Sequence, residues 1–184
     1  MKSIDLMVHE HTYIKRMLTV IRKYCLKILN HKQINYADFY KAIDFVRNYA
    51  DKHHHSKEED ILFKRVNQEV DNNAAKSSIT GMFIEHDSGR LFIQNLERAV
   101  GEVENGNMDA RLDIIGNAIA YTDLLNRHID KEDNVIYVFA EKNLSQAGRE
   151  YVEEYSREVE NSATSKKIQK NYIDLLEELE KGLA

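Results

Sequence analysis

Histidines and acidic residues stand at helical spacing in one short stretch of this chain, residues 50–63, which reads ADKHHHSKEEDILF. Positions four apart in an α-helix project the same way, so a histidine and a carboxylate at i and i+4 can bind one metal ion together. His54 and Glu58 form such a pair, with apolar residues before and after them on the same face. The pattern predicts that both point into the protein as metal ligands.

The neighbouring histidines are predicted to lie on the surface. His55 is in line with the polar residues Asp51 and Glu59, and His53 has Lys57 rather than an acid at i+4. We therefore expect His53, His55 and Lys57 to be solvated.

A second His and acid pair at the same spacing is formed by His128 and Glu132. Asp133 follows directly and also has apolar residues on its face, so either acid could be the ligand. We favour Glu132, because it repeats the spacing of His54 and Glu58.

Four long helices are expected to carry these residues. The chain has no proline and seven glycines, and it is rich in residues that favour helices. Apolar residues recur every three or four positions over about 4–28, 36–70, 74–104 and 109–143, with polar turns between. His11 in the first helix and His86 in the third each replace an apolar residue in a regular apolar stripe.

The expected fold is an all-α, up-down-up-down antiparallel four-helix bundle, because helices joined by short turns pack against their neighbours in this way. Counted from the end with the first and third turns, the four inward histidines lie about 18 to 19 residues, or roughly 27 to 29 Å, along their helices. They therefore share one layer with two glutamates. The six candidate metal ligands are His11, His54, Glu58, His86, His128 and Glu132.

A metal centre explains this layer better than ordinary core packing does. A single buried histidine is usually a hydrogen-bonded core residue, but two buried glutamates without partners would be costly. Two cations that share both carboxylates, with two imidazoles each, remove that cost. Imidazole and carboxylate ligands suit iron, manganese or zinc.

Composition limits the other classes of function. With 184 residues, 42% hydrophobic and 31% charged, the chain fits one globular domain. Cys25 is the single cysteine, which excludes an intrachain disulfide, a thiolate zinc site and an iron–sulfur cluster, and we interpret it as a core residue. A net charge of −5 without a basic block argues against nucleic-acid binding.

No membrane association is expected, because no apolar run approaches the roughly 20 residues of a membrane span. The sequence MKSIDLMVHEH lacks the apolar region of a signal peptide, so we expect a cytoplasmic location. Residues 1–144 are expected to form the bundle. The more polar residues 145–184 are expected to add one or two helices that pack on the bundle or form a homodimer surface.

The motifs around the candidate ligands resemble those of the hemerythrin-like proteins with the HHE cation-binding domain. The similar segments are HEHTYI, FVRNYADKHHHSKEEDILF, EHDSGR and LLNRHIDKEDNVIY, one on each expected helix, within residues 4–144. The resemblance implies two non-haem iron ions, bridged by two carboxylates and an oxo or hydroxo group, at the six positions. It also implies an open iron position that takes O2, NO or peroxide.

One position departs from the oxygen-carrying members of that family. They have a second histidine one turn before the ligand of the third helix, where this chain has Met82. The missing ligand favours chemistry or iron release over O2 carriage. Ferritin-like carboxylate oxidases are not expected, because they need Glu-x-x-His pairs and none occurs here.

Two functions follow from the resemblance. The first is a di-iron protein that binds or senses O2, NO or peroxide. The second is a di-iron enzyme for iron–sulfur cluster repair by iron donation, or for reduction of peroxide or O2; no catalytic residue is assigned. A structural zinc bundle is a third interpretation.

Three residues near the expected centre keep two interpretations. Glu10 and Glu85, each next to a candidate ligand, either hydrogen-bond the ligand histidines or lie on the helix surface. Gly89 leaves a pocket for a diatomic ligand or allows close helix packing.

Overall fold

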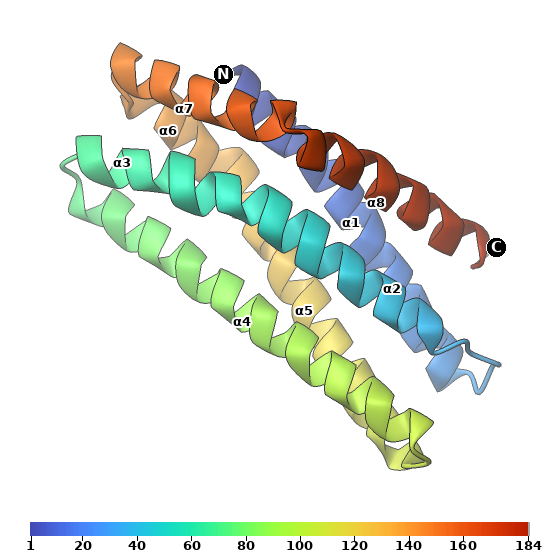
Figure 1. Ribbon diagram of the computed structural model, residues 1–184. Coiled ribbons are helices and arrows are strands. Elements are labelled where there is room, and N and C mark those ends of the chain that lie inside the picture. The colour runs from blue at the N-terminus through green and yellow to red at the C-terminus, as the bar shows by residue number, and fades with distance from the viewer. Residues whose placement is uncertain (184) are drawn as a thin grey trace.

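The protein is all-α, and a computed structural model describes residues 1–162 and 166–183 in full and the backbone of residues 163–165 (Figure 1). Helices make up 89% of it. The first and third bundle helices are α1 (Lys2–Leu29) and α4 (Asn73–Glu104). The second consists of α2 (Ala37–Phe45), η1 (Val46–His55), η2 (Glu58–Phe63) and α3 (Lys64–Glu69). The fourth consists of the 3₁₀ turn η3 (Met108–Ala110), α5 (Arg111–Lys131), η4 (Glu132–Ile136) and α6 (Tyr137–Asn143).

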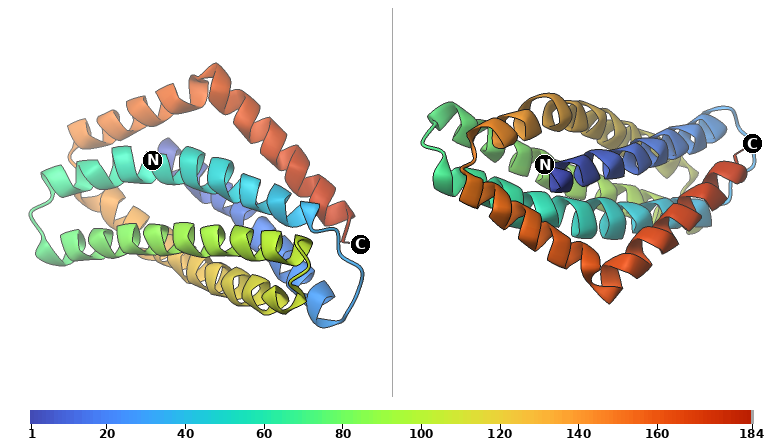
Figure 2. Two further views of the ribbon diagram at one scale, coloured as in Figure 1. Left: turned by 60° about the horizontal axis from the view of Figure 1, so that its bottom comes forward. Right: turned by 90° about the horizontal axis from the view of Figure 1, so that it is seen from above.

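The four helices run up, down, up and down, which confirms the expected bundle (Figures 1 and 2). Short polar turns reverse the chain between them. Gly106 adopts a φ of +96° in the third turn, a backbone conformation that glycine allows without strain. The side chain of Asn72 caps α4 by accepting a hydrogen bond from the backbone N–H of Ala75 at 3.1 Å.

The segments η1, η2 and η4 are π-helical, with backbone hydrogen bonds to the fifth residue along the chain rather than the fourth. They interrupt the second and fourth bundle helices at the His54–Glu58 and His128–Glu132 pairs. Such turns often occur at functional sites, because they change the direction in which successive side chains point.

The apolar core consists of two clusters with a polar layer between them. On α1, Ile4 and Met7 belong to one cluster and Ile14 begins the other. On α4, Met82 belongs to the same cluster as Ile4, and Ile93 belongs to the same cluster as Ile14. Both clusters bury large side chains almost completely, so the layer between them is shielded from water on both sides.

Two further helices, α7 (Gln146–Asn161) and α8 (Ala163–Lys181), lie on the outside of the bundle and form a V over it (Figure 2). Val152, Leu176 and Leu179 from these helices are 2% exposed or less, so they contribute to the core. A bidentate ion pair between Arg16 and Glu180, at 3.0 and 2.6 Å, joins α8 to α1. No helix among the described residues combines the length and the apolar character needed to cross a membrane.

Candidate metal centre

The structure brings the six candidate residues together in the polar layer between the two apolar clusters. They come from all four bundle helices, and none is more than 2% exposed. Ring centroids are 4.5 Å apart for His11 and His54 and 4.6 Å apart for His86 and His128. The layer therefore contains two histidine pairs with two glutamates among them.

Each of the four histidines has a carboxylate on its Nδ1 atom, on the side away from the centre. These pairs are His11 with Asp133 at 2.7 Å, His54 with Glu10 at 2.7 Å, His86 with Glu59 at 2.6 Å and His128 with Glu85 at 2.9 Å. An imidazole that donates its Nδ1–H to a carboxylate keeps the lone pair on Nε2 for a metal ion. All four imidazoles are therefore oriented as ligands.

In neutral imidazoles, these tautomers leave Nε2 lone pairs that face one another. The Nε2 atoms of His86 and His128 are 2.8 Å apart, and both are acceptors when Nδ1 carries the hydrogen. The Nε2 atoms of His11 and His54 are buried without a hydrogen-bond partner. A cation in the layer would remove the repulsion and satisfy these atoms.

Each glutamate presents one oxygen to each histidine pair. In Glu58, Oε1 is 3.6 Å from Nε2 of His54 and Oε2 is 3.6 Å from Nε2 of His86. In Glu132, Oε2 is 3.4 Å from Nε2 of His11 and Oε1 is 2.9 Å from Nε2 of His128. This is the arrangement in which a carboxylate can bridge two metal ions.

The donor atoms form two groups in which all ligand atoms lie within 4.8 Å of one another. One group consists of His11, His54, Glu58 and Glu132, and the other of His55, Glu58, His86 and His128. Glu58 belongs to both. Nitrogen and oxygen ligands in this number fit a pair of iron, manganese or zinc ions.

The electrostatics of the layer also fit bound cations. Burial, together with the nearby Glu132 carboxylate, raises the pKa of Glu58 well above its usual range. Burial, together with the neighbouring His11, lowers the pKa of His54 to about 4. His54 is therefore neutral at pH 7, as a metal ligand must be. Oε2 of Glu58 and both carboxylate oxygens of Glu132 lack hydrogen-bond partners.

The acids with two sequence interpretations lie in different surroundings. Glu132 is fully buried in the layer, whereas the Asp133 side chain is 23% exposed and bonds to the outer face of His11. Glu10 and Glu85 are not free surface acids, because they accept the Nδ1–H bonds of His54 and His128.

Tyr137 belongs to the site but is not one of the six candidate ligands. Its hydroxyl donates a hydrogen bond to Oε1 of Glu58, and its ring stacks on His11 with centroids 5.7 Å apart. Tyr137 therefore holds one of the two central carboxylates.

The prediction that His53, His55 and Lys57 are solvated was wrong. They are 3%, 7% and 1% exposed. The pattern was read with α-helical periodicity, but this segment is π-helical, so the faces of the helix rotate relative to that expectation. In addition, α7 brings Glu160 against His53, which no local pattern indicates.

His55 lies beside the centre instead of at the surface. Its ring stacks on that of His86, with centroids 3.8 Å apart and planes 11° apart. Its Nδ1 is 3.3 Å from Asp51, which is four residues earlier in the chain. That His and acid spacing was the sequence signal that could have found it.

Lys57 forms a buried ionic cluster with Glu10, His53 and Glu160. Its ammonium donates to both carboxylates, and Nε2 of His53 is 3.1 Å from Oε1 of Glu10. The two carboxylates and His53 could hold a metal ion by distance, but the Lys57 ammonium already provides the cation there. Because Glu10 also bonds to His54, the cluster links α7 to the centre.

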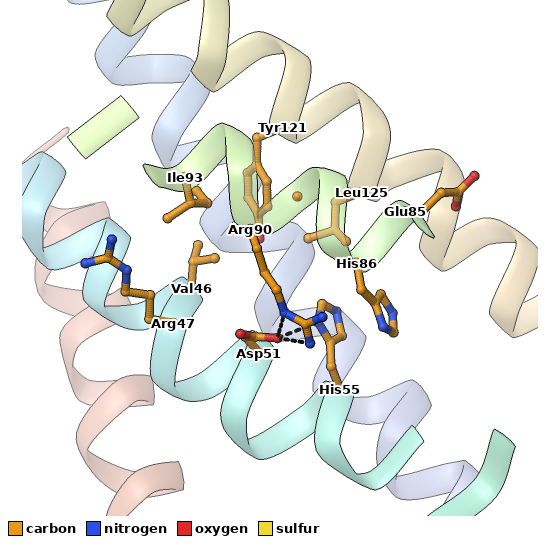
Figure 3. A pocket seen from close by; sticks show the side chains of 11 residues that line it. Val46, Arg47, Asp51, His55, Glu85, His86, Arg90, Ile93, Tyr121 and Leu125 are labelled. Carbon is orange, nitrogen blue, oxygen red and sulfur yellow. Dashed lines mark hydrogen bonds and ion pairs between the residues drawn. The ribbon is translucent and has the colours of Figure 1, made fainter. Parts of the chain in front are cut away.

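A cavity of about 120 Å³ lies next to the second histidine pair, between η1, α4 and α5 (Figure 3). His55, His86, Arg90 and Tyr121 line it together with Gly89. A Cβ atom at Gly89 would lie 3.5 Å from Cε2 of Tyr121, an ordinary contact distance. Gly89 therefore lines the pocket, and the packing of α4 on α5 does not require a glycine there.

A four-helix bundle with a buried layer of carboxylate-oriented histidines and two glutamates among them is compatible with metal binding. A family model described as the hemerythrin HHE cation binding domain matches residues 2–140, and the chain belongs to this family. No curated protein and no solved structure matches the chain.

Proposed function

We propose that this chain binds two non-haem iron ions and that one of them keeps an open position for O2, NO or peroxide. The proposed ligands are His11, His54, Glu58, His86, His128 and Glu132. The observation that carries the proposal is the pair of buried glutamates, which present one oxygen to each histidine pair and have three oxygens without hydrogen-bond partners, because a pair of cations would satisfy these oxygens.

The residues around the proposed iron ions would have different roles. Glu58 and Glu132 would bridge the ions, since each presents one oxygen to each histidine pair. The outer carboxylates would hold the imidazoles in place and increase their basicity. The iron pair would supply a redox-active Lewis acid able to exchange electrons with a small bound molecule. Met82, which is buried in the apolar core, offers no imidazole where the oxygen carriers have one.

The first test is elemental analysis of the purified full chain, with absorption spectra before and after reduction and re-exposure to O2. About two irons per chain, with absorption bands lost in Glu58→Ala and His86→Ala, would support the centre. His9→Ala is the matched control, because His9 is exposed. Stoichiometric zinc, or a folded protein that binds no metal, would refute the proposal.

A di-iron enzyme is the second candidate, and the cavity beside His55 and His86 favours it because a substrate could reach the metal site there. Spectra separate the two. A ligand spectrum that reverses under vacuum indicates a carrier or sensor, and rapid irreversible oxidation by O2 or peroxide indicates an oxidase or an iron donor.

We further propose that residues 1–144 form the metal-binding unit and that residues 145–184 are a helical extension packed on the outside of this unit. Glu160 of α7 supports this division, since it completes the cluster around Lys57. The expected cytoplasmic location, the homodimer and the absence of nucleic-acid binding stay predictions.

A further inference from the structure

The cavity lies against one half of the proposed centre. His55 and His86 form part of its wall, and both offer ligand atoms to the same metal position (Figure 3). His11 and His54, which belong to the other position, do not line it. A molecule in this cavity is therefore next to the position formed by His55, Glu58, His86 and His128.

Tyr121 contributes a buried hydroxyl that has no hydrogen-bond partner. The side chain is 2% exposed, and its ring extends through the cavity with the hydroxyl toward the side where Arg90 and His55 lie (Figure 3). Burial raises the pKa of Tyr121, and the Asp51 carboxylate raises it further, so the hydroxyl is a donor at neutral pH. A buried donor without an acceptor is costly, which points to a ligand that supplies one.

The charged side chains of the cavity wall are already paired with opposite charges. The pairs are Arg90 with Asp51 and Glu59, Arg47 with Glu97, and Glu85 with Lys131. These charged side chains therefore already have partners of opposite charge. The donor that remains is the neutral hydroxyl of Tyr121, in a cavity that also has apolar walls formed by Val46, Ile93 and Leu125.

We propose that this cavity binds a small molecule with a hydrogen-bond-accepting oxygen, namely hydrogen peroxide, and that Tyr121 donates to that oxygen. This rests on the proposed iron centre and narrows its ligand. Gly89 leaves the room for the ligand, because any larger residue would place its Cβ against the Tyr121 ring.

The experiment mixes iron-loaded full-length protein with hydrogen peroxide in a stopped-flow spectrometer. It measures the peroxide concentration that gives half the maximal rate of the spectral change. Loss of one hydrogen bond should raise that concentration about fivefold to tenfold in Tyr121→Phe. The melting temperature of metal-free Tyr121→Phe should be unchanged or higher, because the variant removes an unpaired buried hydroxyl.

Two matched controls separate binding from packing. Tyr24→Phe removes a hydroxyl that bonds to Asp38 at 3.0 Å, away from the cavity, and should leave peroxide binding unchanged. Gly89→Ala and Gly81→Ala both lie on α4 and should both raise the melting temperature by about 2 to 4 °C, since alanine favours a helix over glycine. Gly81 has nothing within 4 Å of its added Cβ, so Gly89→Ala alone should weaken peroxide binding.

The outcomes are distinct. If iron-loaded Tyr121→Phe and Gly89→Ala bind peroxide as tightly as the wild-type protein does, the assignment of the cavity is overturned. The proposal of the iron centre is not affected by that result. Azide serves as a comparison ligand: a loss in Tyr121→Phe that is confined to azide would overturn the assignment of peroxide to the cavity. If wild-type protein holds no iron, or holds iron that no small ligand affects, the proposed function itself fails.

Discussion

The buried Lys57 ammonium should contribute strongly to stability, and Lys57→Met tests this directly. The Lys57 side chain is 0% exposed and its partners Glu10 and Glu160 are 1% and 19% exposed. Removing one partner of a buried ion pair typically costs about 3 to 5 kcal/mol, because the remaining charges lose their compensation. Since Glu160 keeps some contact with water, we expect about 3 kcal/mol here.

The assay is thermal unfolding of the metal-free protein, so that metal binding does not add to stability. For a chain of this size, about 3 kcal/mol corresponds to a melting temperature lower by about 6 to 12 °C. Lys15→Met is the matched control: Lys15 pairs with Asp130 at 2.8 Å, but the two side chains are 39% and 65% exposed. An exposed pair of this kind is worth about 0.5 kcal/mol.

A second variant tests why Lys57→Met loses stability. If the unpaired carboxylates cause it, Glu160→Gln added to Lys57→Met should recover part of the stability. The reasoning is refuted if Lys57→Met destabilises no more than Lys15→Met does.

Three further predictions concern the centre. Iron binding near pH 7 should release protons and weaken as the pH falls, because burial raises the pKa of Glu58 and the metal must displace its proton. An indicator dye in weak buffer measures the proton release. An iron affinity that is constant from about pH 6 to 8 would contradict the prediction. Asp133→Asn should weaken iron binding about 10- to 100-fold, because His11 loses the carboxylate that holds its ring. Asp130→Asn, at an exposed position, should not weaken it. Equal iron affinities of the two variants in a chelator competition would count against this role of Asp133. Tyr137→Phe should retain the fold but shift the absorption bands of the iron-loaded protein, since Glu58 loses a hydrogen-bond donor, and an unchanged spectrum would exclude that role.

Local patterns predicted the helices and the six inward residues, because they depend on short-range geometry. Apolar spacing and polar turns determine where the helices run, and a His and acid pair at i and i+4 shares a face in an α-helix. The all-α bundle is confirmed, and His86 in the apolar stripe of α4 indeed lies in the polar layer. The ligand roles stay a proposal.

Contacts between distant segments decided the rest. His55 became part of the site wall because π-helical turns rotate it toward His86, and Lys57 became buried because α7 places Glu160 over it. Asp133, Glu59 and Tyr137 acquired their roles from partners on other helices. Residues and their spacing thus determined that the six candidate side chains face inward. The cavity, the outer carboxylates and the buried ammonium depend on how separate helices pack, which no local periodicity encodes.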